Sequence, residues 1–199
     1  MTIFEHKCKK QHNGSTRRRG SSSFHMHDPE LLFKELNVQK GDKFLDLGCG
    51  AGDYTIRVSL IVGNEGTVYA LDQSKEAIES LQQRCHQMKV HNARTQVCNI
   101  LNHLPFEDSE VDICFVATVL HTLNIHKNGD TFFNEIHRVV KPGGQLITID
   151  CKKEQANFGP PLSMRLAPDE IIDIAEKCGF KSTKIVDLGF NYMIKFISM

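Results

Sequence analysis

The chain has 199 residues, and its 24 lysines and arginines balance its 24 aspartates and glutamates. This length fits one domain with a short tail. The balanced charge gives no overall field that would draw the protein to nucleic acid or an anionic membrane, so we expect neither partner. No apolar run approaches the roughly 20 residues that a membrane helix needs. The N-terminus also lacks the apolar segment of a secretory signal.

Cysteines and histidines give no sign of a disulfide framework or of a metal site. The seven cysteines are scattered and form no C-x-x-C pair, so disulfides and zinc fingers are both disfavoured. The histidines near the N-terminus complete no conventional set of zinc ligands. We therefore expect free thiols, no bound metal and a cytoplasmic location.

The first residues, 1–22, differ from the rest of the chain in composition. They are basic, polar and rich in serine and glycine, without apolar periodicity. This composition predicts a flexible tail before a single domain at 23–199. The three arginines at 17–19 could bind RNA or another polyanion, although short basic runs are more often simply solvated.

Strand and helix patterns alternate along the domain. Asp28-Pro29-Glu30 predicts the start of a short helix that runs to Asn37. Apolar runs that end in turn residues predict buried parallel strands, at 43–47, 67–71, 95–98, 111–116 and 145–150. Helical spacing predicts intervening helices, at 54–61, after Ser74, and up to a break at Lys141-Pro142-Gly143-Gly144.

The end of the chain adds a helix and two strands. Pro168 opens the helix and Gly179 closes it. Two final strands, at about 181–187 and 191–197, suit an antiparallel hairpin. The whole pattern predicts a Rossmann-like, doubly wound α/β sheet that is mostly parallel, with an antiparallel strand at or near one edge.

A glycine-rich turn follows the first predicted strand, in the segment Leu45-Asp46-Leu47-Gly48-Cys49-Gly50-Ala51-Gly52. Glycines in such a turn let a ligand approach the backbone where a Cβ would clash. In a doubly wound sheet, this turn lies at the edge where ligands bind. Asp72 ends the second strand, twenty positions after Gly52. Its carboxylate can accept hydrogen bonds from both hydroxyls of a ribose.

These features alone fit NAD as well as S-adenosylmethionine. A dinucleotide fold usually spaces its glycines G-x-G-x-x-G, so that a pyrophosphate lies on the helix N-terminus. Here the spacing is G-x-G-x-G, and Asp46 precedes it. An acidic group there repels a pyrophosphate but suits a ligand that carries an ammonium and a sulfonium. Asp46 could hold the amino-acid end of that ligand, or brace the turn by accepting backbone N–H groups.

Several segments together resemble the class I S-adenosylmethionine-dependent methyltransferases, especially the small ubiquinone/menaquinone-biosynthesis-type group. The resemblance runs from about Phe24 to the C-terminus and rests on FLDLGCGAGDYT, VYALDQS, LPFEDSEVDICFVATVLHTL, EIHRVVKPGGQLITID and LAPDEIIDIAEKCGF. It is specific for the fold and the cofactor, and not for the methyl acceptor. It implies a seven-stranded sheet with one antiparallel strand.

The resemblance also implies a set of cofactor-binding residues. The methionine part of the cofactor is expected to lie against the turn, at Asp46, Gly48, Cys49, Gly50 and Gly52. Asp72 is expected at the ribose, Gln73 beside the adenine, and Ala117 near the methionine end. Asn99, followed by Ile100, stands where the family usually has an aspartate facing the adenine amino group. An amide keeps an acceptor oxygen there but loses the charge.

Three further residues are candidates for contact with the methyl acceptor. Transfer from a sulfonium depends mostly on alignment and on exclusion of water, and a base helps where the nucleophile must lose a proton. His121, just after the fourth strand, is the candidate base, although it could simply pack near the cofactor. Cys151 and Arg165 are candidate substrate contacts. A small half-buried thiol and a surface salt bridge are their simpler roles.

The sequence leaves three classes of function open. The first is methyl transfer from S-adenosylmethionine to a small molecule, which we favour. The second is methyl transfer to RNA or protein that docks through the basic tail. The third is a protein that binds S-adenosylmethionine without catalysis, or a nucleotide oxidoreductase.

Overall fold

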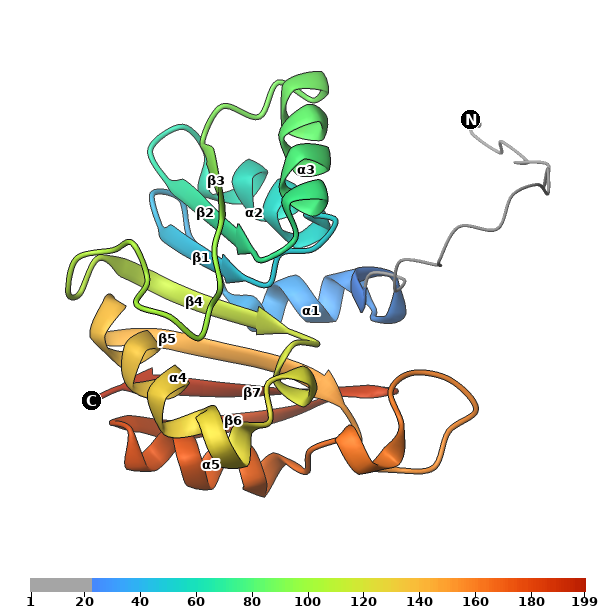
Figure 1. Cartoon of the computed structure of the whole chain (residues 1–199). Helices are drawn as coiled ribbons and strands as arrows, with labels where there is room; N and C mark the ends of the chain where they lie inside the picture. The colour runs from blue at the N-terminus through green and yellow to red at the C-terminus, as the bar shows by residue number, and fades with distance from the viewer. Residues whose placement is uncertain (1–22) are drawn as a thin grey trace.

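The computed structural model describes residues 23–199, which form a seven-stranded mixed sheet with helices on both faces (Figure 1). The flexible tail expected at 1–22 lies outside the described residues. The strands are β1 Lys43–Leu47, β2 Thr67–Asp72, β3 Ala93–Val97, β4 Val111–Ala117, β5 Val140–Cys151, β6 Phe180–Leu188 and β7 Asn191–Ser198. Their order across the sheet is β3-β2-β1-β4-β5-β7-β6.

Six strands run in one direction and β7 runs against them. The pairs along β3, β2, β1, β4 and β5 are all parallel, whereas β7 is antiparallel to both β5 and β6. The predicted fold class is therefore confirmed, including the single antiparallel strand contributed by the C-terminal hairpin. That strand lies one place in from the edge of the sheet.

The predicted helices are present, and two of them begin at the expected caps. The α-helices are α1 Pro29–Leu36, α2 Asp53–Val62, α3 Lys75–Gln87, α4 Ile125–Val139 and α5 Pro168–Lys177. Asp28 caps α1 by accepting from the Glu30 N–H at 2.9 Å, and Ser74 caps α3 by accepting from the Ala77 N–H at 3.2 Å. None of the helices in the described part of the chain is long and apolar enough to cross a bilayer.

Buried apolar residues form three clusters, one on the face covered by α4 and α5 and two on the face covered by α1, α2 and α3. Because side chains alternate between faces along a strand, Phe44 packs into the core beneath α1 and α2, whereas Leu45 packs into the core beneath α4 and α5. Figure 1 shows α4 in front of the sheet and α1 behind it. The helices on the two faces together fix the carboxyl ends of the central parallel strands at the same side of the sheet.

The start of β5 differs from the prediction. A break was expected at 141–144 with the strand beginning at 145, but α4 ends at Val139 and β5 begins at once. The β4–β5 register passes from Val111 opposite Val140 to Ile113 opposite Gln145, so residues 141–144 bulge out opposite one residue of β4. Proline and glycine tolerate such a bulge, and a Cβ at Gly144 would lie 2.9 Å from the Asp112 carbonyl oxygen.

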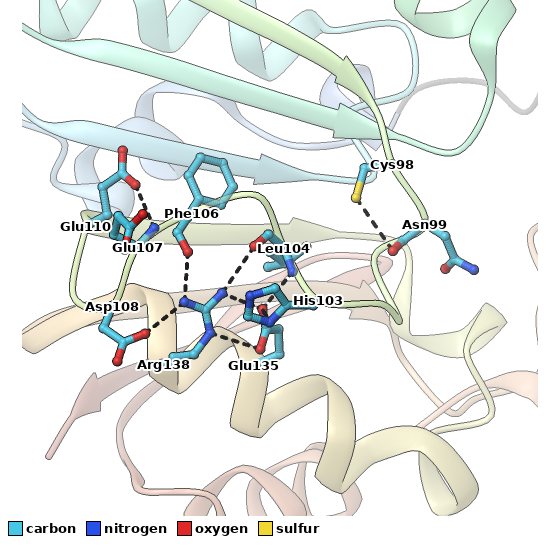
Figure 2. Close-up of polar contacts among 10 residues, drawn as sticks. All are labelled: Cys98, Asn99, His103, Leu104, Phe106, Glu107, Asp108, Glu110, Glu135 and Arg138. Atoms are coloured by element: carbon cyan, nitrogen blue, oxygen red, sulfur yellow. Dashed lines mark hydrogen bonds and ion pairs between the residues drawn. The ribbon is translucent and has the colours of Figure 1, made fainter.

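The connection from β3 to β4 contains no helix, and none was predicted between the strands at 95–98 and 111–116. Its residues 98–110 instead cross the face of the sheet as a loop, pinned by Arg138 of α4 (Figure 2). The guanidinium donates to the carbonyls of Leu104 at 3.2 Å and Phe106 at 2.8 Å. Glu135 accepts from the Leu104 N–H at 2.7 Å and pairs with Arg138 at 2.6 Å. The loop held by this ion pair covers β1 and β2, in the position that a crossover helix would take.

Candidate active site

The carboxyl ends of the parallel strands surround a cavity of about 550 Å³. Ligands of doubly wound folds bind at this edge, and the volume lies in the usual range for small-molecule sites. Of the predicted cofactor residues, the cavity is lined by Gly48, Asp72, Gln73, Asn99 and Ile100. These predicted residues come from the ends of three strands, and they meet at the wall of one cavity.

The structure explains the presence of glycine differently at each of the three positions of the turn. All have positive φ, at +76° for Gly48, +50° for Gly50 and +77° for Gly52. A Cβ on Gly48 would lie 2.5 Å from Val119, and one on Gly52 would overlap Leu81. A Cβ on Gly50 would meet nothing closer than the Gly48 carbonyl oxygen, at 4.0 Å. Gly48 and Gly52 are therefore required by packing, whereas Gly50 leaves open space for a ligand.

Asp72 ties the glycine turn to the end of β2. One carboxylate oxygen accepts from the Gly50 N–H at 2.9 Å, and the other accepts from the Ser74 N–H at 2.8 Å. Each oxygen keeps a further lone pair. The carboxylate is thus fixed in orientation at the wall of the cavity and can still accept two hydrogen bonds from a ligand.

Five of the predicted cofactor residues are not among those that line the cavity, namely Asp46, Cys49, Gly50, Gly52 and Ala117. Asp46 is 2% exposed and accepts from the Thr55 hydroxyl at 2.6 Å, which links β1 to α2. Burial raises the pKa of Asp46 to about 7, and the charge of Asp72 adds to the shift. Burial likewise raises the pKa of the Cys49 thiol, which makes it unreactive. The N–H groups of Gly48 and Cys49 are bonded to the Leu71 carbonyl and that of Gly50 to Asp72, so these contacts are not the bracing of the turn that was considered for Asp46.

Asn99 begins the pinned loop with a local turn. Its side-chain oxygen accepts from the Leu101 N–H at 3.1 Å, so one of its two acceptor positions is occupied. The amide N–H groups have no hydrogen-bond partner among the described residues, and the residue lines the cavity beside Gln73. The side chain therefore offers donors as well as the acceptor that was expected.

A second cavity, of about 380 Å³, adjoins the first and shares Thr122 and Asn124 with it. His121, in the short helix η2 Leu120–Thr122, lines this second cavity. Its Nδ1 lies 2.8 Å from Oδ1 of Asp150, which is completely buried at the end of β5. Asp150 was not among the residues predicted for the site. The available signal was the one used for Asp72, an acidic residue that ends an apolar strand.

Comparison with known proteins agrees with this arrangement. The sequence pattern of a family described as "Methyltransferase domain" matches residues 38–179 of the chain. The chain belongs to this methyltransferase domain family. Its predicted membership among the S-adenosylmethionine-dependent methyltransferases is thereby confirmed.

Individual relatives of this methyltransferase-domain protein include a demethylmenaquinone methyltransferase of a Geobacillus species (strain WCH70). It is 33% identical over 129 residues, which cover 65% of this chain and 53% of the relative. A demethylmenaquinone methyltransferase of Staphylococcus saprophyticus is 33% identical over 133 residues, covering 66% and 54% of the two chains. The chain spans about half the length of these curated relatives.

A solved structure covers the methyltransferase-domain protein more completely. It is a SAM dependent methyltransferase from Aquifex aeolicus, 30% identical, with a TM-score of 0.81 over 89% of this chain and 93% of that chain. The family and this structure support S-adenosylmethionine as the cofactor, as predicted. The contacts of individual residues with the cofactor stay a prediction.

Cys151 of the methyltransferase-domain protein lies beside the His121–Asp150 pair and not in either cavity. It is 2% exposed, and its thiol lies 3.4 Å from Oδ1 of Asp150. Burial and the Asp150 charge raise the pKa of Cys151 to about 12. Atoms of His121, Asp150 and Cys151 that could coordinate a metal ion lie within 4.8 Å of one another. Hydrogen bonds account for this cluster, and contact of Cys151 with a substrate stays a prediction.

Arg165 has different partners from those expected of a substrate contact or a surface salt bridge. It is 3% exposed, and its guanidinium donates to four backbone carbonyls of the loop after β5. These are the carbonyls of Lys152 at 3.3 Å, Glu154 at 2.6 Å, Phe158 at 2.8 Å and Pro160 at 2.9 Å. Arg165 therefore holds the wall of the second cavity in place, and most of its donors are already used.

Proposed function

We propose that this protein transfers a methyl group from S-adenosylmethionine to a small-molecule acceptor. The observation that carries the proposal is the open space at Gly50 beside the fixed carboxylate of Asp72. A nucleoside needs a place where it can approach the backbone and a paired acceptor for its ribose hydroxyls. Asp72 lines the larger cavity, and its carboxylate accepts from the Gly50 N–H at 2.9 Å, so the turn lies next to that wall.

The residues around the turn would hold the cofactor and orient it. Asp72 would accept from the ribose hydroxyls, while Gln73, Asn99 and Ile100 would lie beside the adenine. Asp46 would add negative potential from beneath the turn, on the side where the cationic end of the ligand lies. When bound, S-adenosylmethionine supplies an activated methyl group, so the protein's main tasks are alignment and exclusion of water.

The second cavity is the proposed acceptor site. It adjoins the larger cavity through Thr122 and Asn124, and its volume of about 380 Å³ suits a small molecule. Relatives named for methyl transfer to demethylmenaquinone support a ring compound of quinone type as the first class to test. His121 would act as the base for such an acceptor.

Two measurements test the proposal. Calorimetry with S-adenosylhomocysteine and with NADH should show binding of the former and none of the latter. Methyl-labelled S-adenosylmethionine is then offered with a panel comprising a reduced naphthoquinone, a phenol, a thiol and an amine, and label should transfer to one of them. Binding of NADH in place of S-adenosylhomocysteine would refute the proposal. Cofactor binding without transfer to any member of the panel or to a cell extract would favour a non-catalytic role.

RNA or protein remains the alternative acceptor, because the basic tail at 1–22 lies outside the described residues. Deleting these residues separates the two classes. An RNA-dependent activity should collapse on deletion and fall steeply with added salt, whereas transfer to a small molecule should persist. The cytoplasmic location stays a prediction that cell fractionation can test.

A further inference from the structure

The Asp150 carboxylate is held by the backbone at both of its oxygens. Oδ2 accepts from the His121 N–H at 3.1 Å, and Oδ1 accepts from the Cys151 N–H at 2.8 Å. Asp150 is completely buried, so no water competes for these bonds. The carboxylate is therefore fixed independently of the His121 ring that it contacts.

This fixed carboxylate decides which nitrogen of the His121 ring carries the proton. Nδ1 lies 2.8 Å from Oδ1 of Asp150, and an ionised carboxylate only accepts hydrogen bonds. Nδ1 must therefore be the donor, which leaves the lone pair of a neutral ring on Nε2. The His121 side chain is 13% exposed and lines the second cavity. A proton acceptor is thus held beside that cavity.

The other ionisable side chains around this cavity are already engaged. Glu170 pairs with Lys153 at 2.8 Å and with His126 at 3.3 Å. Arg165 is bonded to backbone carbonyls. Among the described residues that line the second cavity, His121 is the group best placed to accept a proton from a ligand.

We propose that Asp150 is a positioning residue that holds His121 as the base for an acceptor whose nucleophile is a weakly acidic hydroxyl. This inference rests on the proposed function. A thiolate would need no base, whereas a phenolic or enolic hydroxyl must lose its proton. In the step, the hydroxyl proton passes to Nε2 and the oxygen forms a bond to the methyl carbon. The carbon–sulfur bond breaks, and its electron pair stays on sulfur. Asp150 stabilises the imidazolium until the proton leaves to water.

The tautomer is tested first, because that measurement needs no acceptor. Nitrogen NMR of the full chain should show His121 protonated at Nδ1 and unprotonated at Nε2, with His121→Gln used to assign the signals. In Asp150→Asn the new amide can donate to Nδ1, so the ring should shift toward the Nε2–H tautomer. Asp173→Asn, an exposed acid on α5, is the matched control and should change nothing. A wild-type ring protonated at Nε2 would overturn the proposal.

The acceptor class is tested with 4-nitrophenol, whose absorption shows whether its hydroxyl is ionised. Protein loaded with S-adenosylhomocysteine should bind it as the phenolate, and should bind the amine isostere 4-nitroaniline more weakly. His121→Gln and Asp150→Asn should each weaken phenolate binding by about tenfold or more, the effect of losing a charge-assisted hydrogen bond. Equal phenolate binding by wild type and variants, or no binding of 4-nitrophenol, would overturn the assignment.

Two controls separate this inference from the proposed function and from misfolding. If S-adenosylhomocysteine does not bind the wild type, the proposed function fails, while the tautomer measurement still decides the role of Asp150. If it binds wild type and variants alike, a lost phenolate signal reflects the His121–Asp150 pair and not an unfolded protein. Tight binding of Zn²⁺ that removes the Nδ1 proton would assign His121, Asp150 and Cys151 to a metal site, and would overturn the proposal.

Discussion

The two halves of the ligand-binding edge are built by different means. At the ends of β1 and β2, the site is made of backbone, because positive φ at Gly50 opens the space and Asp72 accepts from backbone N–H groups. At the ends of β4 and β5, it is made of side chains, in which Asp150 orients His121 and Arg165 holds a loop. The first half is therefore suited to one constant ligand. The second can change its acceptor by substitution of side chains without rebuilding the sheet.

Gly50→Val should break the backbone-built half most completely. The valine side chain would occupy the open space at Gly50, so affinity for S-adenosylhomocysteine should fall by about a thousandfold or more, which is about 4 kcal/mol. Strain at positive φ should cost about 1–3 kcal/mol of stability and leave a folded protein. Gly143→Val is the matched control, because Gly143 has φ +74° and open space but lies in the β5 bulge. Calorimetry and circular dichroism check both variants. Retained affinity in Gly50→Val would show that the turn does not contact the cofactor.

Asp46→Asn should change how the stability of the protein depends on pH, because Asp46 is a buried acid beneath the backbone-built half. The pKa of Asp46 is about 7 in the folded protein against 3.8 as the ordinary value, so the folded state binds this proton more tightly. Its contribution to stability is therefore full at low pH and is lost as pH rises toward and beyond 7. Between pH 5 and pH 8, the variant should gain about 2–3 kcal/mol relative to wild type. Urea unfolding at both pH values measures this gain. An identical pH dependence in the two proteins would contradict the assignment.

Asp72→Ala should weaken the cofactor half without closing it. Loss of hydrogen bonds to a charged acceptor should reduce affinity for S-adenosylhomocysteine by about 1.5–3 kcal/mol, or roughly tenfold to 150-fold. Asp72→Asn keeps one acceptor oxygen, so its affinity for S-adenosylhomocysteine should lie between those of Asp72→Ala and wild type. Calorimetry on all three proteins gives the comparison. An unchanged dissociation constant in Asp72→Ala would exclude the proposed ribose contact.

Arg138→Met should show how far the two halves depend on each other. Arg138 lies on α4, yet it holds the loop that carries Asn99 to the cofactor cavity. Its loss should cost about 2 kcal/mol and lower the Tm by roughly 4–8 °C. Affinity for S-adenosylhomocysteine should fall by only about twofold to fivefold, because the turn itself is untouched. Arg94→Met, on the exposed side of β3, should leave both quantities unchanged. Thermal unfolding and calorimetry decide the outcome.

The sequence predicted the backbone-built half better than the other half. Residue type alone reports where positive φ or close approach is required, so the glycines near Gly50 and the acid at Asp72 could be read directly. Asp150 carries the same strand-end signal as Asp72, but its partner could not be predicted, because the His121 contact exists only once β4 and β5 are paired. For Arg165, the sequence could not show that nearby carbonyls would use its donors.

The remaining differences arose where several segments must fold before the outcome is decided. The bulge at 141–144 depends on the register with β4, which a local glycine and proline pattern cannot specify. The path of the loop at 98–110 depends on Arg138, far away in the sequence, which supplies its hydrogen bonds. Its own residues carry no helical pattern, so the sequence predicted a loop there but not what holds the loop in place.

The place of β7 in the sheet has a consequence for biosynthesis. β6 is made first, yet it contacts β5 only through β7, which inserts between them. Until residues 191–198 take their place in the sheet, β6 has no neighbour to pair with, and the flank of β5 is bare. A chain that has left the ribosome before β7 has inserted should be captured by chaperones and cut readily by proteases, although the strands from β1 to β4 already have their partners.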